Sequence, residues 1–179
     1  MAIRAIETRY AGCRFRSRLE ARWAVFFDHS GIPWQYEVEG WQLDTYLGRI
    51  KYLPDFRLFN GQIAEVKGHL DLQGCERLYA IAIAACQCSG GSDLVVLGDI
   101  PRPDSARWPI QLHAHSSDLY VVPWALKRGC PLDRPHMRVH PTETLATALT
   151  EGMLAGHPEW ARDSLQAARQ ARFEFGESG

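Results

Sequence analysis

The sequence predicts a mixed α/β fold in which helices flank a mixed β-sheet and a helical extension closes the chain. Three observations predict it: an amphipathic helical pattern, three strand-like segments after it, and a second helical pattern followed by a continuous apolar run. The chain has 179 residues, 46% of them hydrophobic, which suffices for the core of one domain. We expect this core in residues 1–125 and a loop with two helices in residues 126–179.

The first expected element is a helix over residues 17–30. Ser17 can cap its N-terminus, and Gly31 and Pro33 end it. Between them, apolar residues recur at the spacing of one helical face, namely Leu19, Trp23, Phe26 and Phe27. This helix should bury one face against the sheet.

Three strands should follow the first helix. Residues 34–41 and 51–59 are rich in aromatic and β-branched side chains, and residues 62–68 return after the turn signal Asn60-Gly61. The last two strands should therefore form an antiparallel hairpin.

A second helix and further strands should complete the sheet by about residue 125. Residues 72–88 carry few charges at helical apolar spacing, and residues 92–100 are a continuous apolar run, typical of a central strand. The remaining expected elements are a strand at 119–124, a loop rich in arginine and histidine at 127–140, and helices at about 142–155 and 159–173.

The composition narrows the class of protein. Five cysteines form an odd set, which argues against a disulfide framework and favours a reducing compartment. We find no apolar run long enough for a signal peptide or a membrane span. We therefore expect a soluble cytosolic protein without a membrane partner.

Arginine is concentrated near the N-terminus. Residues 1–22 hold six arginines and two glutamates, a local charge of +4 in a chain whose net charge is −1. Such a concentration can contact several phosphates. The candidate nucleic-acid-binding residues are Arg14, Arg16, Arg18 and Arg22, and the alternative is a solvated face of a helix.

Asp55, Glu65 and Lys67 form the candidate catalytic centre. Glu65 and Lys67 are two residues apart on a strand, so their side chains share one face, and burying such charges is costly unless they bind something. Mg²⁺ is a natural partner, because it takes one or two carboxylates and completes its shell with water and phosphate oxygens. Lys67 would then orient or deprotonate the attacking water. The alternative is a turn at Asp55 and a surface salt bridge between Glu65 and Lys67.

The length of the hairpin loop decides whether this site can form. A two-residue Asn60-Gly61 loop would set Asp55 opposite Val66, on the wrong face of the sheet. A three-residue loop with a left-handed Gly61 would set Asp55 opposite Glu65. We therefore expect an odd-length loop or an equivalent bulge.

Glu20 is a third candidate acid, because it shares a helical face with Trp23 and Phe27 and so points toward the sheet. The alternative for Glu20 is a surface partnership with Arg16. Together, FRSRLEARWAVFF, YLPDFRLF and AEVKG resemble the PD-(D/E)XK nuclease superfamily, in particular its small phage-type and prophage-type members. The similarity covers residues 10–100, and its specificity lies in the helix-strand-strand context more than in the letters.

The resemblance implies a restriction-endonuclease-like αβββαβ core and hydrolysis of DNA to a 5′-phosphate in a bacterial or phage-infected cell. It implies Mg²⁺ or Mn²⁺ held by Asp55, Glu65, Glu20 and the backbone of Val66, with Lys67 completing the catalytic set. Cutting both strands of a duplex would need two active sites, which a homodimer would supply. The second helix departs from the Gln-x-x-x-Tyr pattern of the exonuclease branch, because Gln73 precedes Tyr79 by six residues.

Two other functions remain open from the sequence. One is a non-catalytic nucleic-acid-binding module on the same fold, although an intact acid-acid-lysine set argues against it. The other is a zinc-containing interaction protein organised by Cys86, Cys88, His113 and His115. The spacing of the two cysteines is C-x-C, which differs from the C-x-x-C of structural zinc sites.

Overall fold

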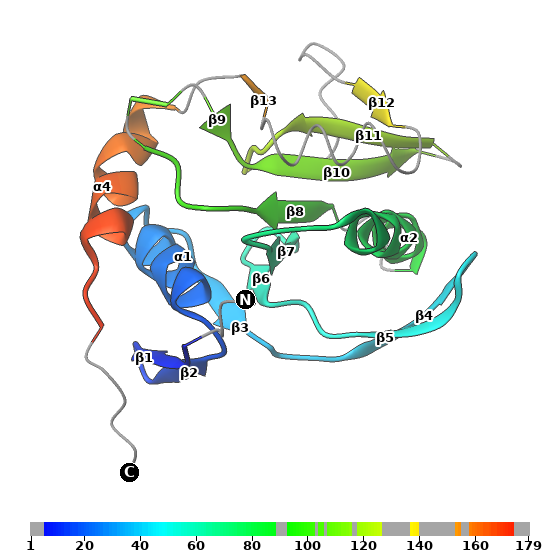
Figure 1. Ribbon diagram of the computed structural model, residues 1–179, viewed down its shortest axis with the longest axis horizontal. Coiled ribbons are helices and arrows are strands. Elements are labelled where there is room, and N and C mark those ends of the chain that lie inside the picture. Colours follow the sequence, from blue (N-terminus) through cyan, green and yellow to red (C-terminus); the bar gives the residue numbers. More distant parts are fainter. Residues whose placement is uncertain are drawn as a thin grey trace.

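The computed structural model describes residues 6–88, 93–102, 104–105, 107–115, 118–126, 137–139, 153–154 and 158–173. The fold is mixed α/β, with a seven-stranded mixed sheet and helices on both of its faces (Figure 1). The sheet order is β12-β11-β10-β8-β7-β6-β3. Its strands are β3 (Trp34–Tyr36), β6 (Phe56–Leu58), β7 (Ile63–Val66), β8 (Leu94–Leu97), β10 (Ile110–His115), β11 (Asp118–Pro123) and β12 (Met137–Val139).

The centre of the sheet is a parallel pair. β7 runs parallel to β8, and the other neighbouring strands of the sheet are antiparallel. A parallel pair needs a crossover, which α2 (Leu72–Cys88) provides as the sequence predicts. Both β7 and β8 are buried along their whole length, in agreement with the apolar run at residues 92–100.

Helix α1 (Arg18–His29) covers one face of the sheet. Ser17 caps it as expected, and Trp23, Phe26 and Phe27 are fully buried. The C-terminal helix α4 (Arg162–Gln170), preceded by the 3-10 turn η1 (Glu159–Ala161), packs beside α1 (Figure 1). Leu165 and Ala168 of α4 thereby join the hydrophobic core under α1.

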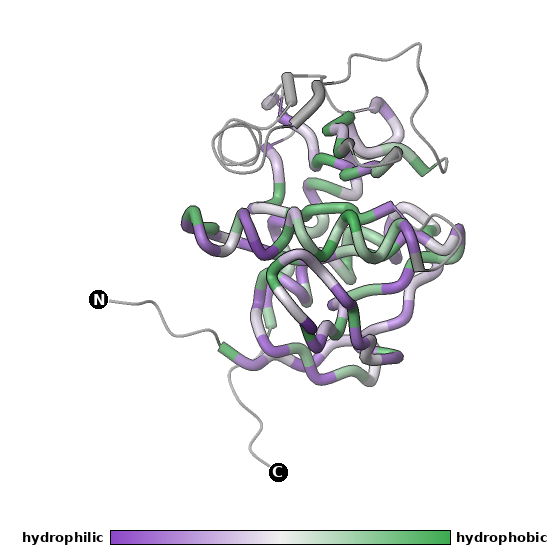
Figure 2. Tube along the Cα trace, turned by 90° about the vertical axis from the view of Figure 1, so that its right-hand side faces the viewer, coloured by the Kyte–Doolittle hydropathy of each residue, from purple (hydrophilic) through white to green (hydrophobic). Residues whose placement is uncertain are grey.

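Helix α2 covers the other face, and a separate hairpin packs against α2. The hairpin pairs β4 (Trp41–Thr45) with β5 (Gly48–Tyr52) and extends to the side of the sheet (Figure 1). Hydrophobic and hydrophilic stretches alternate along the helical turns (Figure 2), as expected for helices with one buried face. Two further pairs join β1 (Thr8–Tyr10) to β2 (Cys13–Phe15) and β9 (Arg107–Trp108) to β13 (Met153–Leu154).

Two predicted strands are broken in the structure. The strand expected at residues 34–41 ends at Tyr36, and Glu37 takes a left-handed conformation with φ of 45° before β4 begins. The strand expected at 51–59 is interrupted between β5 and β6 around Pro54, which has no N–H to donate to a ladder. As a result, β4 and β5 pair with each other outside the main sheet.

The second half of the sheet differs from expectation in its extent. His113 and His115 lie in β10, whereas the sequence suggests only a polar loop or the end of a strand around them. β12 adds a strand inside the predicted 127–140 loop, so the sheet continues past residue 125. Residues 153–154 form β13 instead of the end of a helix, and the rest of the helix expected at 142–155 lies outside the described residues. In the described part of the chain, helices are too short or too polar to cross a membrane.

Candidate active site

The β6–β7 hairpin has the predicted three-residue loop. Leu58 donates its N–H to the Gln62 carbonyl at 2.9 Å, and Gly61 donates back to the Leu58 carbonyl at 2.9 Å. Gly61 is left-handed, with φ of 79°. Because Phe56 pairs with Ala64, the next pair along the ladder sets Asp55 opposite Glu65. The expected pairing parity is confirmed.

Asp55 is buried, with 2% of its surface exposed. Its Oδ2 accepts the N–H of Val66 at 2.7 Å, and its Oδ1 accepts from Nη2 of Arg16 at 2.7 Å. Burial, followed by the negative charge of Glu65, raises the pKa of Asp55 to about 7. The structure thus places two mutually repelling carboxyl groups side by side, one just before β6 and one on β7.

Glu65 is held from two sides. Lys67 places its Nζ 2.6 Å from Oε1 of Glu65, and the Tyr52 hydroxyl donates to Oε2 at 3.0 Å. The Glu65 side chain is 9% exposed, whereas 36% of the Lys67 side chain reaches solvent. Sequence reasoning missed Tyr52. The feature that could have indicated it is its position three residues before Asp55, at the end of the preceding strand.

Glu20 points inward as predicted, but its carboxylate caps its own helix. The Ser17 hydroxyl donates to Oε1 at 2.6 Å, while the Arg16 N–H and the Tyr36 hydroxyl donate to Oε2 at 3.0 and 2.5 Å. In return, Glu20 donates its N–H to Oγ of Ser17 at 3.2 Å. The arrangement resembles a capping box, except that the Glu20 carboxylate accepts from the Arg16 N–H and the Ser17 hydroxyl instead of the Ser17 N–H. The spacing Ser-x-x-Glu could have indicated it from the sequence. Glu20 still lies near enough to raise the pKa of Asp55.

The four arginines that were predicted to bind nucleic acid lie in different parts of the structure. Arg14 forms an exposed ion pair with Glu7, and Arg16 contacts both Asp55 and Glu37, each at 2.7 Å. Arg18 and Arg22 lie on α1, one helical turn apart. The structure therefore brings Arg16 to the acids and Arg22 to the neighbouring cleft.

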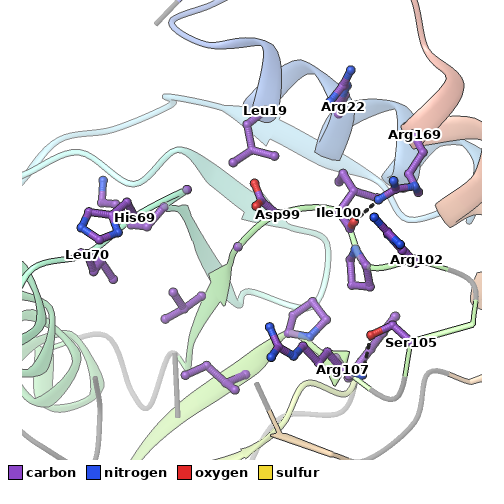
Figure 3. A pocket seen from close by; sticks show the side chains of 18 residues that line it. Leu19, Arg22, His69, Leu70, Asp99, Ile100, Arg102, Ser105, Arg107 and Arg169 are labelled. Atoms are coloured by element: carbon purple, nitrogen blue, oxygen red, sulfur yellow. Dashed lines mark hydrogen bonds between the residues drawn. The ribbon is translucent and has the colours of Figure 1, made fainter. Parts of the chain in front are cut away.

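A cleft of about 850 Å³ opens beside Lys67. It lies between α1, the segments that follow β7 and β8, and α4 (Figure 3). Lys67, four arginines and His69 line it, with Asp99 as the acidic member of the described lining. A polyanion could approach the motif through this cleft.

Oxygen atoms of Asp55, Glu65 and one backbone carbonyl are the candidate ligands for a divalent cation. Val66 donates its N–H toward Asp55, whereas the N–H of Lys67 points the other way, to the Leu97 carbonyl at 2.8 Å. A strand residue directs its C=O to the same side as its N–H, so the Val66 carbonyl also lies on the Asp55 side. Asp55, Glu65 and this carbonyl make a two-carboxylate donor set of the kind Mg²⁺ accepts.

A site with three acids is not formed as the side chains stand. Among the described residues, no three His, Cys, Asp or Glu side chains are grouped so that they could hold a metal ion. Glu20 instead accepts hydrogen bonds from Arg16 and Ser17 at the start of α1 and from Tyr36 of β3. Glu65 also shares its strand face with Ile63, on the α2 side of the sheet, whereas Glu20 approaches from α1.

The residues of the zinc hypothesis serve other contacts where the structure describes them. Nδ1 of His113 lies 2.6 Å from Oδ1 of the buried Asp93. Burial raises the pKa of the Cys86 thiol to about 11, which disfavours the thiolate that would bind zinc. The side chains of Cys88 and His115 lie outside the described residues.

No protein-family model, curated protein or solved structure matches the chain.

Proposed function

We propose that this protein is a Mg²⁺-dependent nuclease that hydrolyses phosphodiester bonds of DNA. The observation that carries the proposal is the register of the β6–β7 hairpin, which sets the buried Asp55 opposite the buried Glu65. A sheet that served only stability would gain from apolar residues at these positions, because buried like charges are costly. A cation and a phosphate would offset that cost.

The order of elements supports a restriction-endonuclease-like core. Along the main sheet the chain runs through α1, β3, β6, β7, α2 and β8, which is a helix, three strands, a helix and a strand. The β4–β5 hairpin then stands as an insertion between the first two of these strands. The resemblance of the sequence to PD-(D/E)XK nucleases and this order point to the same proposal.

In the proposed mechanism, Asp55, Glu65 and the Val66 carbonyl would hold the cation. Mg²⁺ would supply stabilisation of charge on the phosphoryl oxygens and acidify the attacking water. Lys67, whose Nζ lies 2.6 Å from Oε1 of Glu65, would donate a hydrogen bond that orients the attacking water. Tyr52 fixes the other oxygen of Glu65, so that the carboxylate keeps one orientation. Glu20 acts as a positioning residue that orders the backbone of Arg16.

The test compares substrates and matched variants. Labelled duplex, single-stranded, flap and junction DNA and RNA are incubated with Mg²⁺, Mn²⁺ or EDTA. Asp55→Asn and Glu65→Gln should lose at least about 100-fold in cleavage rate, as expected when a metal site is damaged. Asp44→Asn is the control, because Asp44 is an exposed acid on the β4–β5 hairpin, paired with Arg49. Equal activity of all four proteins would overturn the proposed site.

The alternative is a nucleic-acid-binding module without catalysis. One observation favours it: Arg16 already places a cation on Oδ1 of Asp55, where a metal would bind. The two functions differ in one measurement, since a binding module would retain DNA with Mg²⁺ present and leave it uncut.

A further inference from the structure

The cleft beside Lys67 concentrates positive charge far beyond the average of the chain. Its described lining contains five cationic residues and one acidic residue, a formal charge of +4, in a protein of net charge −1. The cations are Lys67, Arg22, Arg102, Arg107 and Arg169. Like charges gathered in one cleft repel one another, and an anionic ligand would relieve this repulsion.

Segments far apart in the sequence supply these arginines. Arg22 comes from α1, Arg102 from the segment after β8, and Arg169 from α4. Figure 3 shows these three along one side of the cleft, with Arg107 across it and His69 at the far end. Folding therefore brings these positively charged side chains together in one cleft.

Two details indicate a ligand that contacts these arginines. The Nε atom of Arg22 is buried and has no hydrogen-bond partner among the described residues, which is costly for a donor. Arg169 donates from Nη1 to the Ile100 carbonyl at 2.9 Å, which fixes its guanidinium at the rim of the cleft (Figure 3). A guanidinium held in this way is ready to bind phosphate oxygens.

The positively charged surface continues past the cleft. A second hollow of about 560 Å³ shares Arg22 and Arg169 with the first and extends to Arg172. Cations spaced along two adjoining hollows suit a row of phosphates better than one compact anion.

We propose that this cleft binds the phosphodiester backbone of a nucleic-acid strand and leads it to Lys67, so that α4 is part of the substrate-binding surface. The inference rests on the proposed function for the identity of the strand as substrate. It gives the C-terminal helix a role in binding, in addition to its packing against α1.

The experiment measures binding separately from cleavage. A fluorescent DNA of about 20 nucleotides, single- or double-stranded, is titrated in EDTA over about 50–200 mM salt. Arg102→Gln and Arg169→Gln should each weaken binding roughly 3- to 10-fold and reduce the salt slope for duplex by about 0.9. Arg49→Gln is the matched control, because Arg49 is an exposed arginine on the β4–β5 hairpin, away from α4 (Figure 1).

A conservative variant separates charge from packing. Arg169→Gln also removes the hydrogen bond to Ile100, so its unfolding temperature is measured alongside. Arg169→Lys keeps the charge and should restore the salt slope. Unchanged binding in both cleft variants would overturn the proposal, as would an equal loss in Arg49→Gln. Equal affinity for a nucleoside triphosphate and for the DNA strand would overturn the assignment to a strand.

The result also distinguishes this inference from the proposed function. If the chain binds DNA through the cleft arginines but does not cut it with Mg²⁺, the cleft assignment is supported and the proposed nuclease activity is refuted. If the chain cuts DNA and the cleft variants bind as well as the wild type, the nuclease stands and the cleft assignment fails.

Discussion

Asp55 ties its carboxylate to the opposite strand by accepting the backbone N–H of Val66 at 2.7 Å. β6 begins only at Phe56, so the Asp55 side chain takes the place that a strand carbonyl would hold in a longer ladder. This fixes Oδ2 relative to β7 and leaves Oδ1 to face cations. The position of the acid is thus set by the sheet, which is the arrangement that a preorganised site requires.

The stability of the metal-free protein should depend on pH through Asp55. Its pKa is raised from 3.8 to about 7 on folding, so between these values the folded state binds more protons than the unfolded state. Its contribution to stability is therefore full at low pH and lost as pH rises through about 7. Asp55→Asn removes this dependence, and the variant should gain stability relative to wild type between about pH 5 and pH 8.

The measurement is thermal unfolding in EDTA across that range. Mg²⁺ added at the alkaline end should stabilise the wild type and leave Asp55→Asn unchanged. Asp44→Asn serves as the control, because the Arg49 hydrogen bond lowers the pKa of Asp44 below its ordinary value, outside this window. An Asp55→Asn profile parallel to that of the wild type would contradict the assignment.

Tyr52→Phe should destabilise the protein and slow cleavage. The variant removes a buried hydroxyl that donates to Glu65 at 3.0 Å and leaves the carboxylate oxygen poorly satisfied. The expected cost is about 1–3 kcal/mol of the free energy of unfolding, with a loss of cleavage rate. Tyr46→Phe is matched in chemistry, but Tyr46 is 58% exposed and its hydroxyl lies 3.4 Å from the Glu76 carbonyl. That control should change stability by less than about 0.5 kcal/mol.

Arg16→Ala should reduce the Mg²⁺ concentration that cleavage needs. The Arg16 guanidinium lies 2.7 Å from Oδ1 of Asp55, so it competes with a cation for the same oxygen. Its side chain is 58% exposed, and the ion pair is therefore partly screened by solvent, which predicts a shift of a few-fold. The Arg16 backbone N–H still reaches Glu20, so the helix cap should survive.

Arg14→Ala removes the same charge from a neighbouring exposed ion pair with Glu7. Half-maximal Mg²⁺ concentrations are compared for the two variants. The same shift in both would show a general effect of charge, and no shift in Arg16→Ala would remove Arg16 from competition for the metal.

The sequence predicts the local elements better than the long-range pairings. α1 and α2 follow from their apolar periodicity, and the hairpin parity follows from the requirement that Asp55 face Glu65. The break at Glu37 does not, because a left-handed glutamate has no signal in composition or periodicity. A strand whose partners lie far along the chain, such as β10, is defined by tertiary pairing more than by its own pattern.

The candidate site divides in the same way. The relative placement of Asp55, Glu65 and Lys67 can be predicted from the sequence, because their spacing along the β6–β7 hairpin determines which face of the sheet each side chain occupies. Glu20 shows the limit of sequence reasoning. A helical wheel gives the direction of its side chain, but it does not show that the carboxylate is already hydrogen-bonded to the hydroxyl of the N-cap residue. The same holds for Arg169, because the sequence alone does not show that α4 returns to pack beside α1.

Gly61→Ala tests the loop that sets the register. Gly61 has φ of 79°, a conformation that costs an alanine roughly 1–2 kcal/mol. In a domain of this size such a loss lowers the unfolding temperature by about 2–8 °C. Gly31→Ala is the matched control, because Gly31 has φ of 64° with open space around its Cβ position, at the end of α1 instead of in the hairpin. Both variants should lose similar stability.

The rate of cleavage should distinguish Gly61→Ala from Gly31→Ala. Strain at residue 61 acts on the hairpin that sets Asp55 opposite Glu65, whereas strain at residue 31 acts at the far end of α1 from the Ser17 cap. Gly61→Ala should therefore lose activity beyond its loss of stability, and Gly31→Ala should not. Gly61→Asn should recover part of both properties, because asparagine tolerates the left-handed region better than alanine. Equal cleavage rates in Gly61→Ala and Gly31→Ala, measured well below both unfolding temperatures, would show that the left-handed turn does not hold the two carboxylates in register.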